Sequence, residues 1–124
     1  DWADYLWTVE AAYEDAEAAY LKGLELAPED PLLVGNLGEL YIDVKKEYDK
    51  GFELYEKSLM LKKTPYRLIT MVSFLVHQYE DYNLARMYHK QLVQLSLPNS
   101  IVRNRYLQEK QWNAFLEAEK ILSR

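Results

Sequence analysis

The sequence predicts an all-α fold built from antiparallel helical hairpins. The first observation is internal repetition: a stripe of four residues recurs along the chain at offsets of 35, 34 and 30 residues. The second is the spacing within each copy, 3, 4 and 3 residues, which places the four side chains on one face of a helix. Two-residue alternation, which would indicate strands, is absent from the sequence. The copies are Tyr13, Ala16, Tyr20 and Gly23; Tyr48, Gly51, Tyr55 and Ser58; Tyr82, Ala85, His89 and Leu92; and, more weakly, Trp112, Phe115, Glu119 and Leu122.

A second helix is expected ahead of each of the two clearest copies. Leu37, Gly38 and Tyr41 precede one copy, and the same pattern of a large, a small and a large residue precedes the next. We therefore expect the helices of each hairpin to come closest at Gly38 and at Ser73. The tyrosines at repeat core positions are Tyr13, Tyr20, Tyr41, Tyr48, Tyr55, Tyr82 and Tyr106.

Prolines mark the helix boundaries. Pro31 and Pro65 fall at the expected starts of first helices, whereas Pro28 and Pro98 follow helices that they cannot continue. One repeat domain, residues 1–124, is predicted. It comprises a truncated first hairpin at about 1–30, a second at 31–64, a third at 65–98 and a short last hairpin at 99–124. The stretch TVEAAYEDAEAAY contains no Gly or Pro, so the sequence leaves open whether residues 1–26 form a hairpin or one continuous helix.

The segment NLGELYIDVKKEYDKGFELYEKSLML, residues 36–61, resembles a tetratricopeptide repeat. The match includes the large-small-large pattern of the first helix, the tyrosine that opens the second helix, and the small, aromatic, small series that follows. The resemblance extends over essentially the whole chain and is strong in residues 13–98. It implies a right-handed solenoid whose concave groove, lined by the first helices, binds a peptide or protein segment.

The repeat register predicts which residues line this groove. Ile42, Met71 and Phe74 are the expected apolar anchors among polar neighbours, although Met71 and Phe74 could instead pack against the next hairpin. The predicted groove residues are Tyr5, Asn36, Glu39, Ile42, Asp43, Arg67, Thr70, Met71, Phe74, His77, Gln78, Asn104 and Arg105.

One known binding mode of the family is a clamp for the two carboxylates of an acidic C-terminal peptide. Under the resemblance, Asn36 matches the middle asparagine of the clamp and Arg67 could replace its third-groove lysine. Tyr5 stands where the first asparagine is expected, and Met71 where the arginine is expected. The clamp is incomplete, so a receptor for chaperone tails is not predicted.

The sequence offers no arrangement typical of catalysis or of metal binding. His77 and His89 lie 12 residues apart without a paired metal-ligand spacing. His89 falls on the core stripe, where a hydrogen-bonded and partly buried ring is expected, and His77 falls in the groove. Carboxylates such as Glu14, Asp15 and Glu17 are expected on solvated helix faces. The four glycines fall within expected helices, which gives phosphate binding by a Gly-rich loop no support. We predict no enzyme activity, no metal and no cofactor.

Charge and composition limit the partners. The net charge is −5, but residues 1–62 carry 15 acids and 6 bases (−9), whereas residues 63–124 carry 5 acids and 9 bases (+4). This balance argues against nucleic acid, and the lack of a long apolar run argues against a membrane partner. The chain has no cysteine, which leaves the compartment undecided; a soluble, cytoplasmic location is favoured.

These observations predict a protein-interaction scaffold that binds a peptide or protein segment in a concave helical groove. The alternative is an oligomerisation or regulatory segment of a larger protein, which could itself be an enzyme. Self-association is therefore left open, and the sequence does not indicate the identity of the partner.

Overall fold

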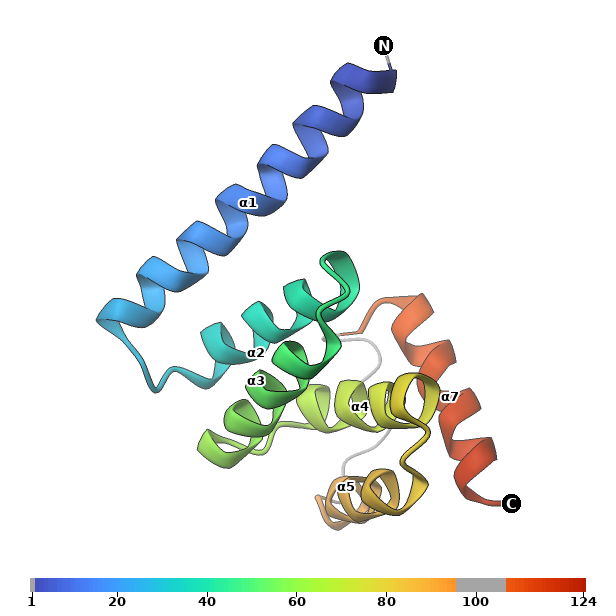
Figure 1. Ribbon diagram of the computed structural model, residues 1–124. Helices are drawn as coiled ribbons and strands as arrows, with labels where there is room; N and C mark the ends of the chain where they lie inside the picture. Colours follow the sequence, from blue (N-terminus) through green and yellow to red (C-terminus); the bar gives the residue numbers. More distant parts are fainter. Residues whose placement is uncertain (1, 96–106) are drawn as a thin grey trace. The chain divides into compact units, whose positions relative to one another are not determined.

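The computed structural model describes residues 2–95 and 107–124, with side chains from residue 9 onward. These residues form α-helices, π-helical turns and connecting turns, without a strand in the described ranges (Figure 1). The predicted all-α class is confirmed. The chain divides into two compact units, Asp1–Lys62 and Lys63–Arg124, and each is described by itself.

Unit 1 begins with α1 (Trp2–Leu26), an uninterrupted helix of 25 residues (Figure 1). Of the two arrangements that the sequence leaves open for residues 1–26, a hairpin or one continuous helix, the structure shows the continuous helix over Trp2–Leu26. The reason is local: neither Gly nor Pro occurs before Gly23, and the middle of α1 is rich in alanine, the residue of highest helix propensity. α1 ends at Leu26, two residues before Pro28.

The rest of unit 1 is a hairpin. α2 (Pro31–Glu39) continues into a π-helical turn, η1 (Leu40–Val44), and α3 (Tyr48–Leu61) then runs back along α2. Asp30 caps α2, because its Oδ1 accepts hydrogen bonds from two backbone N–H groups of the first turn, at 2.9 and 3.3 Å. Pro31 is the first residue of α2, as predicted.

The two helices of this hairpin approach each other at Gly38 and Gly51. A Cβ atom on Gly51 would lie 2.9 Å from the carbonyl oxygen of Gly38 and would clash with Cγ1 of Ile42. A Cβ atom on Gly38 would lie 2.9 Å from Cδ1 of Tyr55 and 3.1 Å from the carbonyl oxygen of Gly51. Backbone therefore packs directly on backbone, which confirms the close approach predicted at Gly38.

The core of unit 1 lies between α1 and the hairpin. Leu37, Leu40 and Tyr41 are buried, and Tyr20 and Leu24 of α1 pack against them. Burial of a large apolar side chain contributes roughly 1.5–3 kcal/mol. The C-terminal half of α1 is therefore held on the hairpin by apolar contact.

Unit 2 contains a second hairpin of the same construction. α4 (Pro65–Phe74) continues into the π-helical turn η2 (Leu75–Tyr79), and α5 (Tyr82–Gln94) follows. Pro65 again begins the helix, and Thr64 caps it by accepting a hydrogen bond from the N–H of Arg67 at 3.2 Å.

The last described helix, α7 (Glu109–Leu122), packs against α4, η2 and α5 within unit 2. Its buried face consists of Trp112, Phe115 and Ala118, and the rings of Trp112 and Phe115 lie 5.6 Å apart. Nε2 of Gln111 donates a hydrogen bond to the hydroxyl of Tyr66 at 3.1 Å. Most of the first helix predicted for the hairpin 99–124 falls on residues 96–106, outside the described residues.

Both hairpins turn in the same way. After each π-helical turn one residue adopts a left-handed conformation: Lys46 at φ 59° and Glu80 at φ 53°. Glu47, which follows Lys46, donates its N–H to the carbonyl of Tyr41 at 2.8 Å. Asp81, which follows Glu80, donates its N–H to the carbonyl of Leu75 at 3.0 Å. Each bond spans six residues, one more than the usual Schellman closure, as expected when the last turn is widened.

The tyrosine predictions have mixed outcomes. Tyr41 and Tyr55, each 3% exposed, fill the core as predicted. Tyr13 and Tyr82 are 40% and 38% exposed, so their predicted core positions are wrong. Tyr106 lies outside the described residues.

We expect Gly51→Ala to lower the free energy of unfolding by roughly 1–3 kcal/mol, because the new methyl group overpacks the contact with Gly38 and Ile42. This loss outweighs a gain in helix propensity of about 1 kcal/mol. Gly23→Ala is the matched control: its Cβ would meet only the flexible end of Leu33, at 3.0 Å, so it should be neutral or stabilising. Urea unfolding measures both, and equal effects would contradict the assigned contact.

We expect Glu80→Gly to stabilise the protein by up to about 1 kcal/mol. The left-handed conformation costs a non-glycine residue about 1–2 kcal/mol, and the larger entropy of glycine in the unfolded chain offsets part of that gain. Glu80→Val should destabilise, because a β-branched residue tolerates positive φ poorly. Thermal melts of both variants test this, and a valine variant as stable as the glycine variant would be inconsistent with the turn.

Candidate interaction surface

The three expected apolar anchors lie in the core. Ile42, Met71 and Phe74 are 8%, 0% and 7% exposed. Ile42 packs at the crossing of α2 and α3 beside Gly51, and the ring of Phe74 lies 4.7 Å from the ring of Tyr79. The structure therefore assigns these side chains to packing, the alternative that the sequence left open for Met71 and Phe74.

The accessible part of the predicted groove in unit 1 is polar. Asn36 and Glu39 of α2 are half-buried, and Asp43 of η1 is exposed. Their spacing of three and four residues keeps them near one side of the first helix. One amide and two carboxylates can together donate and accept hydrogen bonds with an extended peptide.

In unit 2 the predicted groove residues divide into buried and exposed groups. Arg67 is 3% exposed, and its guanidinium lies 5.1 Å from the centre of the Tyr66 ring. The hydroxyl of Thr70, a half-buried residue, donates to the carbonyl of Arg67 at 3.1 Å and lies 3.5 Å from Nη1. His77 and Gln78 are exposed. Arg67 is therefore a packed residue, whereas His77 and Gln78 are accessible.

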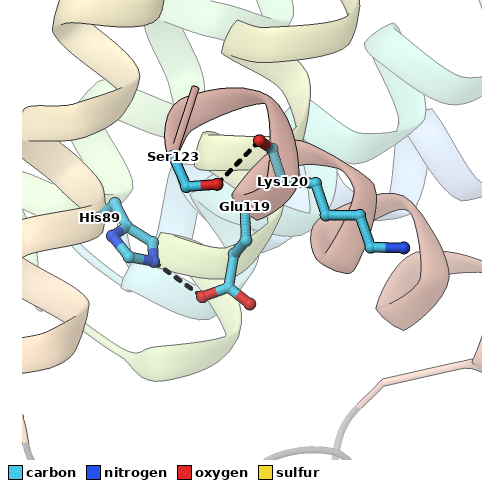
Figure 2. Close-up of polar contacts among 4 residues, drawn as sticks. All are labelled: His89, Glu119, Lys120 and Ser123. Atoms are coloured by element: carbon cyan, nitrogen blue, oxygen red, sulfur yellow. Dashed lines mark hydrogen bonds and ion pairs between the residues drawn. The ribbon is translucent and has the colours of Figure 1, made fainter.

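Both histidines contact α7. His77 Nε2 lies 2.8 Å from the carbonyl oxygen of Ala114, so it donates to α7 instead of being available to a ligand through this nitrogen. His89 Nε2 lies 2.8 Å from Oε2 of Glu119 (Figure 2). The predicted hydrogen-bonded, partly buried ring of His89 is thus confirmed. The same view shows Ser123 donating to the carbonyl of Lys120, at 2.9 Å, where α7 ends (Figure 2).

Three predicted groove residues have no described side chain. Asn104 and Arg105 lie outside the described residues, and Tyr5 is described only as part of the backbone of α1. Within each unit the accessible residues lie on the first helix of the hairpin or on the π-helical turn that continues it: Asn36, Glu39 and Asp43 in unit 1, and Thr70, His77 and Gln78 in unit 2.

A polar cluster that the sequence analysis missed joins α1 to the hairpin of unit 1. Lys45 Nζ donates to Oε1 of Glu17 at 2.8 Å, and Nζ of Lys50 lies 4.4 Å from the centre of the Tyr41 ring. The hydrogen bond with Lys45, followed by one with Tyr41, lowers the pKa of Glu17. Glu17 is half-buried in this contact and does not lie on a solvated face, whereas Glu14 and Asp15 are exposed as predicted. The Lys45 and Glu17 side chains are 30% and 21% exposed, so solvent screens their ion pair.

Exposed apolar side chains gather at one end of unit 1, where α1 ends, α2 begins and α3 ends. Ser58 Oγ donates to the carbonyl of Pro31 at 2.8 Å and ties the end of α3 to the start of α2. The exposed residues there are Leu26, Leu32, Met60 and Leu61, at 84%, 65%, 87% and 36% exposure. We call these four residues the apolar end. Helical periodicity did not mark it, because it is formed by helix termini.

No group of His, Cys, Asp and Glu side chains within residues 9–95 and 107–124 is arranged to hold a metal ion. None of the helices in those ranges combines the length and apolar character that crossing a membrane requires.

Comparison of the chain with protein-family models, with curated proteins and with solved structures found no match. The resemblance to tetratricopeptide repeats therefore remains a prediction from the sequence.

We expect the Tyr41 hydroxyl to stay protonated at unusually high pH. Burial, and then the hydrogen bond and charge of Glu17, raise the pKa of Tyr41 to about 12 from an ordinary value of 10.0. The folded state therefore holds this proton more tightly than the unfolded state, and the free energy of unfolding should fall as pH rises from about 10 to about 12. Tyr41→Phe should lack this component, which urea unfolding across that range would measure. Identical pH profiles for the two proteins would contradict it.

Proposed function

We propose that the chain is a non-enzymatic protein-interaction scaffold that binds a peptide or protein segment along the first helices of its hairpins. The observation that carries the proposal is the repeated construction of α2–η1–α3 and α4–η2–α5. In both hairpins a proline begins the first helix, a π-helical turn ends it, and a left-handed residue leads into the second helix. Repeated helical hairpins that stack as a tetratricopeptide-like solenoid expose extended surfaces suited to an extended ligand.

The recognition chemistry that we propose is polar. Asn36 can donate to a peptide carbonyl and accept from a peptide N–H, and the nearby carboxylates of Glu39 and Asp43 favour a ligand with basic side chains. In unit 2, Gln78 offers a second amide. The apolar anchors predicted from the sequence, Ile42, Met71 and Phe74, are buried. They would therefore support the helices that carry the polar groups and would not contact the ligand.

Selection from a random peptide library against the immobilised chain tests the proposal. The first variant, Asn36→Ala with Asp43→Ala, alters the first helix. The matched control, Leu32→Ser with Met60→Ser, alters the apolar end. Peptides selected on the wild type should lose about tenfold or more in affinity for the first-helix variant, which corresponds to about 1.4 kcal/mol, and bind the control unchanged. The reverse pattern would place binding at the apolar end and contradict the proposal.

The charge distribution adds a kinetic expectation. Residues 1–62 carry −9 and residues 63–124 carry +4, so a charged peptide should associate more slowly as salt screens the field. Dissociation should change little. A salt-independent association rate for a selected basic peptide would remove electrostatic steering from the proposal.

Self-assembly is the second candidate function. It is favoured by one specific observation: α1 continues as a helix through the position at which the two folded hairpins turn, at Lys46 and Glu80.

A further inference from the structure

The helix α1 contains the sequence features of both helices of a hairpin. Leu37, Gly38 and Tyr41 form the large-small-large pattern of the first helix in unit 1. The residues 35 positions earlier are Trp2, Ala3 and Leu6, which repeat the pattern. The second-helix stripe that begins at Tyr13 likewise lies 35 residues before the stripe that begins at Tyr48.

The turn between these two helices is missing. Lys46 and Glu80 are the left-handed residues of the two folded hairpins, and the position equivalent to Lys46 is Ala11, followed by Ala12. Alanine favours the helix and disfavours the left-handed conformation, so the helix continues through this point.

Continuity keeps the two complementary halves of α1 apart. Ala3 and Ala16 occupy the positions equivalent to Gly38 and Gly51, where backbone packs on backbone in unit 1. In a continuous helix these two alanines are separated by 13 residues, or about 20 Å at 1.5 Å per residue, and cannot meet within one chain.

The hairpin of unit 1 covers only part of α1. The ion pair between Glu17 and Lys45 joins α1 to the residue that follows η1. Tyr20 and Leu24 pack beyond it, toward the C-terminal end of α1. On the other side of the ion pair Tyr13 is 40% exposed; of its equivalents in the closed hairpins, Tyr48 is half-buried and Tyr82 is 38% exposed.

We propose that two copies of this chain pair in antiparallel fashion through the N-terminal halves of their α1 helices. Residues 2–10 of each copy then serve as the first helix against the stripe of the other copy. Ala3 lies opposite Ala16 of the partner subunit, and Leu6 lies opposite Tyr13 of the partner subunit, so the two-fold axis passes between residues 9 and 10. The contact is self-complementary, as a two-fold dimer requires, and exchanges one hairpin element between copies.

A second copy is the occupant that the sequence favours, because each chain brings both complementary segments and the register of the contact is already present in α2 and α3. The same register places Asp4 opposite Asp15 of the partner subunit, and α1 carries no base before Lys22. Pairing should therefore strengthen as salt screens this repulsion. The pairing does not require a ligand on the first helices, so it is independent of peptide binding.

Sedimentation velocity across a range of protein concentrations tests the pairing. The wild type should form a species of twice the 14.7 kDa chain mass, and its dissociation constant should fall as salt is added. Ala11→Gly with Ala12→Asp supplies a left-handed residue and an N-cap, the latter matching Asp81, which caps α5. This turn variant should close its own hairpin and sediment as a monomer. The control, Ala18→Gly with Ala19→Asp at exposed positions of α1, should remain a dimer. A monomeric wild type, or equal effects of the two double variants, would overturn the proposal.

Disulfide trapping tests the register in a chain that has no cysteine of its own. Ala3→Cys with Ala16→Cys should give a covalent dimer on oxidation, whereas each single variant should remain unlinked on a denaturing gel. Combined with the turn variant, the same cysteines should link within one chain. Linkage of Ala3→Cys alone would indicate parallel helices, and no linkage in the double variant would indicate no pairing at this site; either result overturns the proposal. Circular dichroism verifies that each variant keeps its helices.

Discussion

The backbone contact between Gly38 and Gly51 sets the geometry of unit 1. Because the Gly38 carbonyl occupies the space that a Cβ of Gly51 would need, the two helix axes lie close, and Tyr55 and Ile42 pack around the contact. Tyr41, on the same first helix, is left to face α1 and its polar cluster. Unit 2 has Ser73 and Ala85 at the matching positions, and Ala85 is fully buried. The Ser73 hydroxyl is buried without a hydrogen-bond partner in the described part of the chain, so small size is what this position requires.

The features that sequence reasoning predicted correctly are those with local causes. Pro31 and Pro65 begin helices because a missing N–H is harmless only in the first turn, and Gly38 marks a helix crossing because a side chain there would separate the helices. The continuity of α1 was left open because two physical effects compete. The repeat pattern favours a hairpin, whereas Ala11 and Ala12 favour a continuing helix, and the structure shows that local propensity prevails in the single chain.

The candidate surface was harder to predict, because exposure depends on the neighbours of a helix. Ile42 lies in η1, where the wider winding shifts residues away from the angles expected for an α-helix, and it turns into the core. Met71 and Phe74 follow ordinary helical spacing, but other side chains cover them. The pair of Glu17 and Lys45 is separated by 28 residues and has no local signal, so it becomes visible only when α1 is placed on the hairpin.

The contacts of the two histidines also determine the chemistry of their other ring nitrogen. A carbonyl oxygen can only accept, so Nε2 of His77 must carry the proton that bonds to Ala114, and the carboxylate of Glu119 makes the same demand on His89. Each neutral ring is therefore held in one tautomer, with Nδ1 as a lone-pair acceptor. At the exposed His77, a molecule that meets the neutral ring through Nδ1 must bring a hydrogen-bond donor.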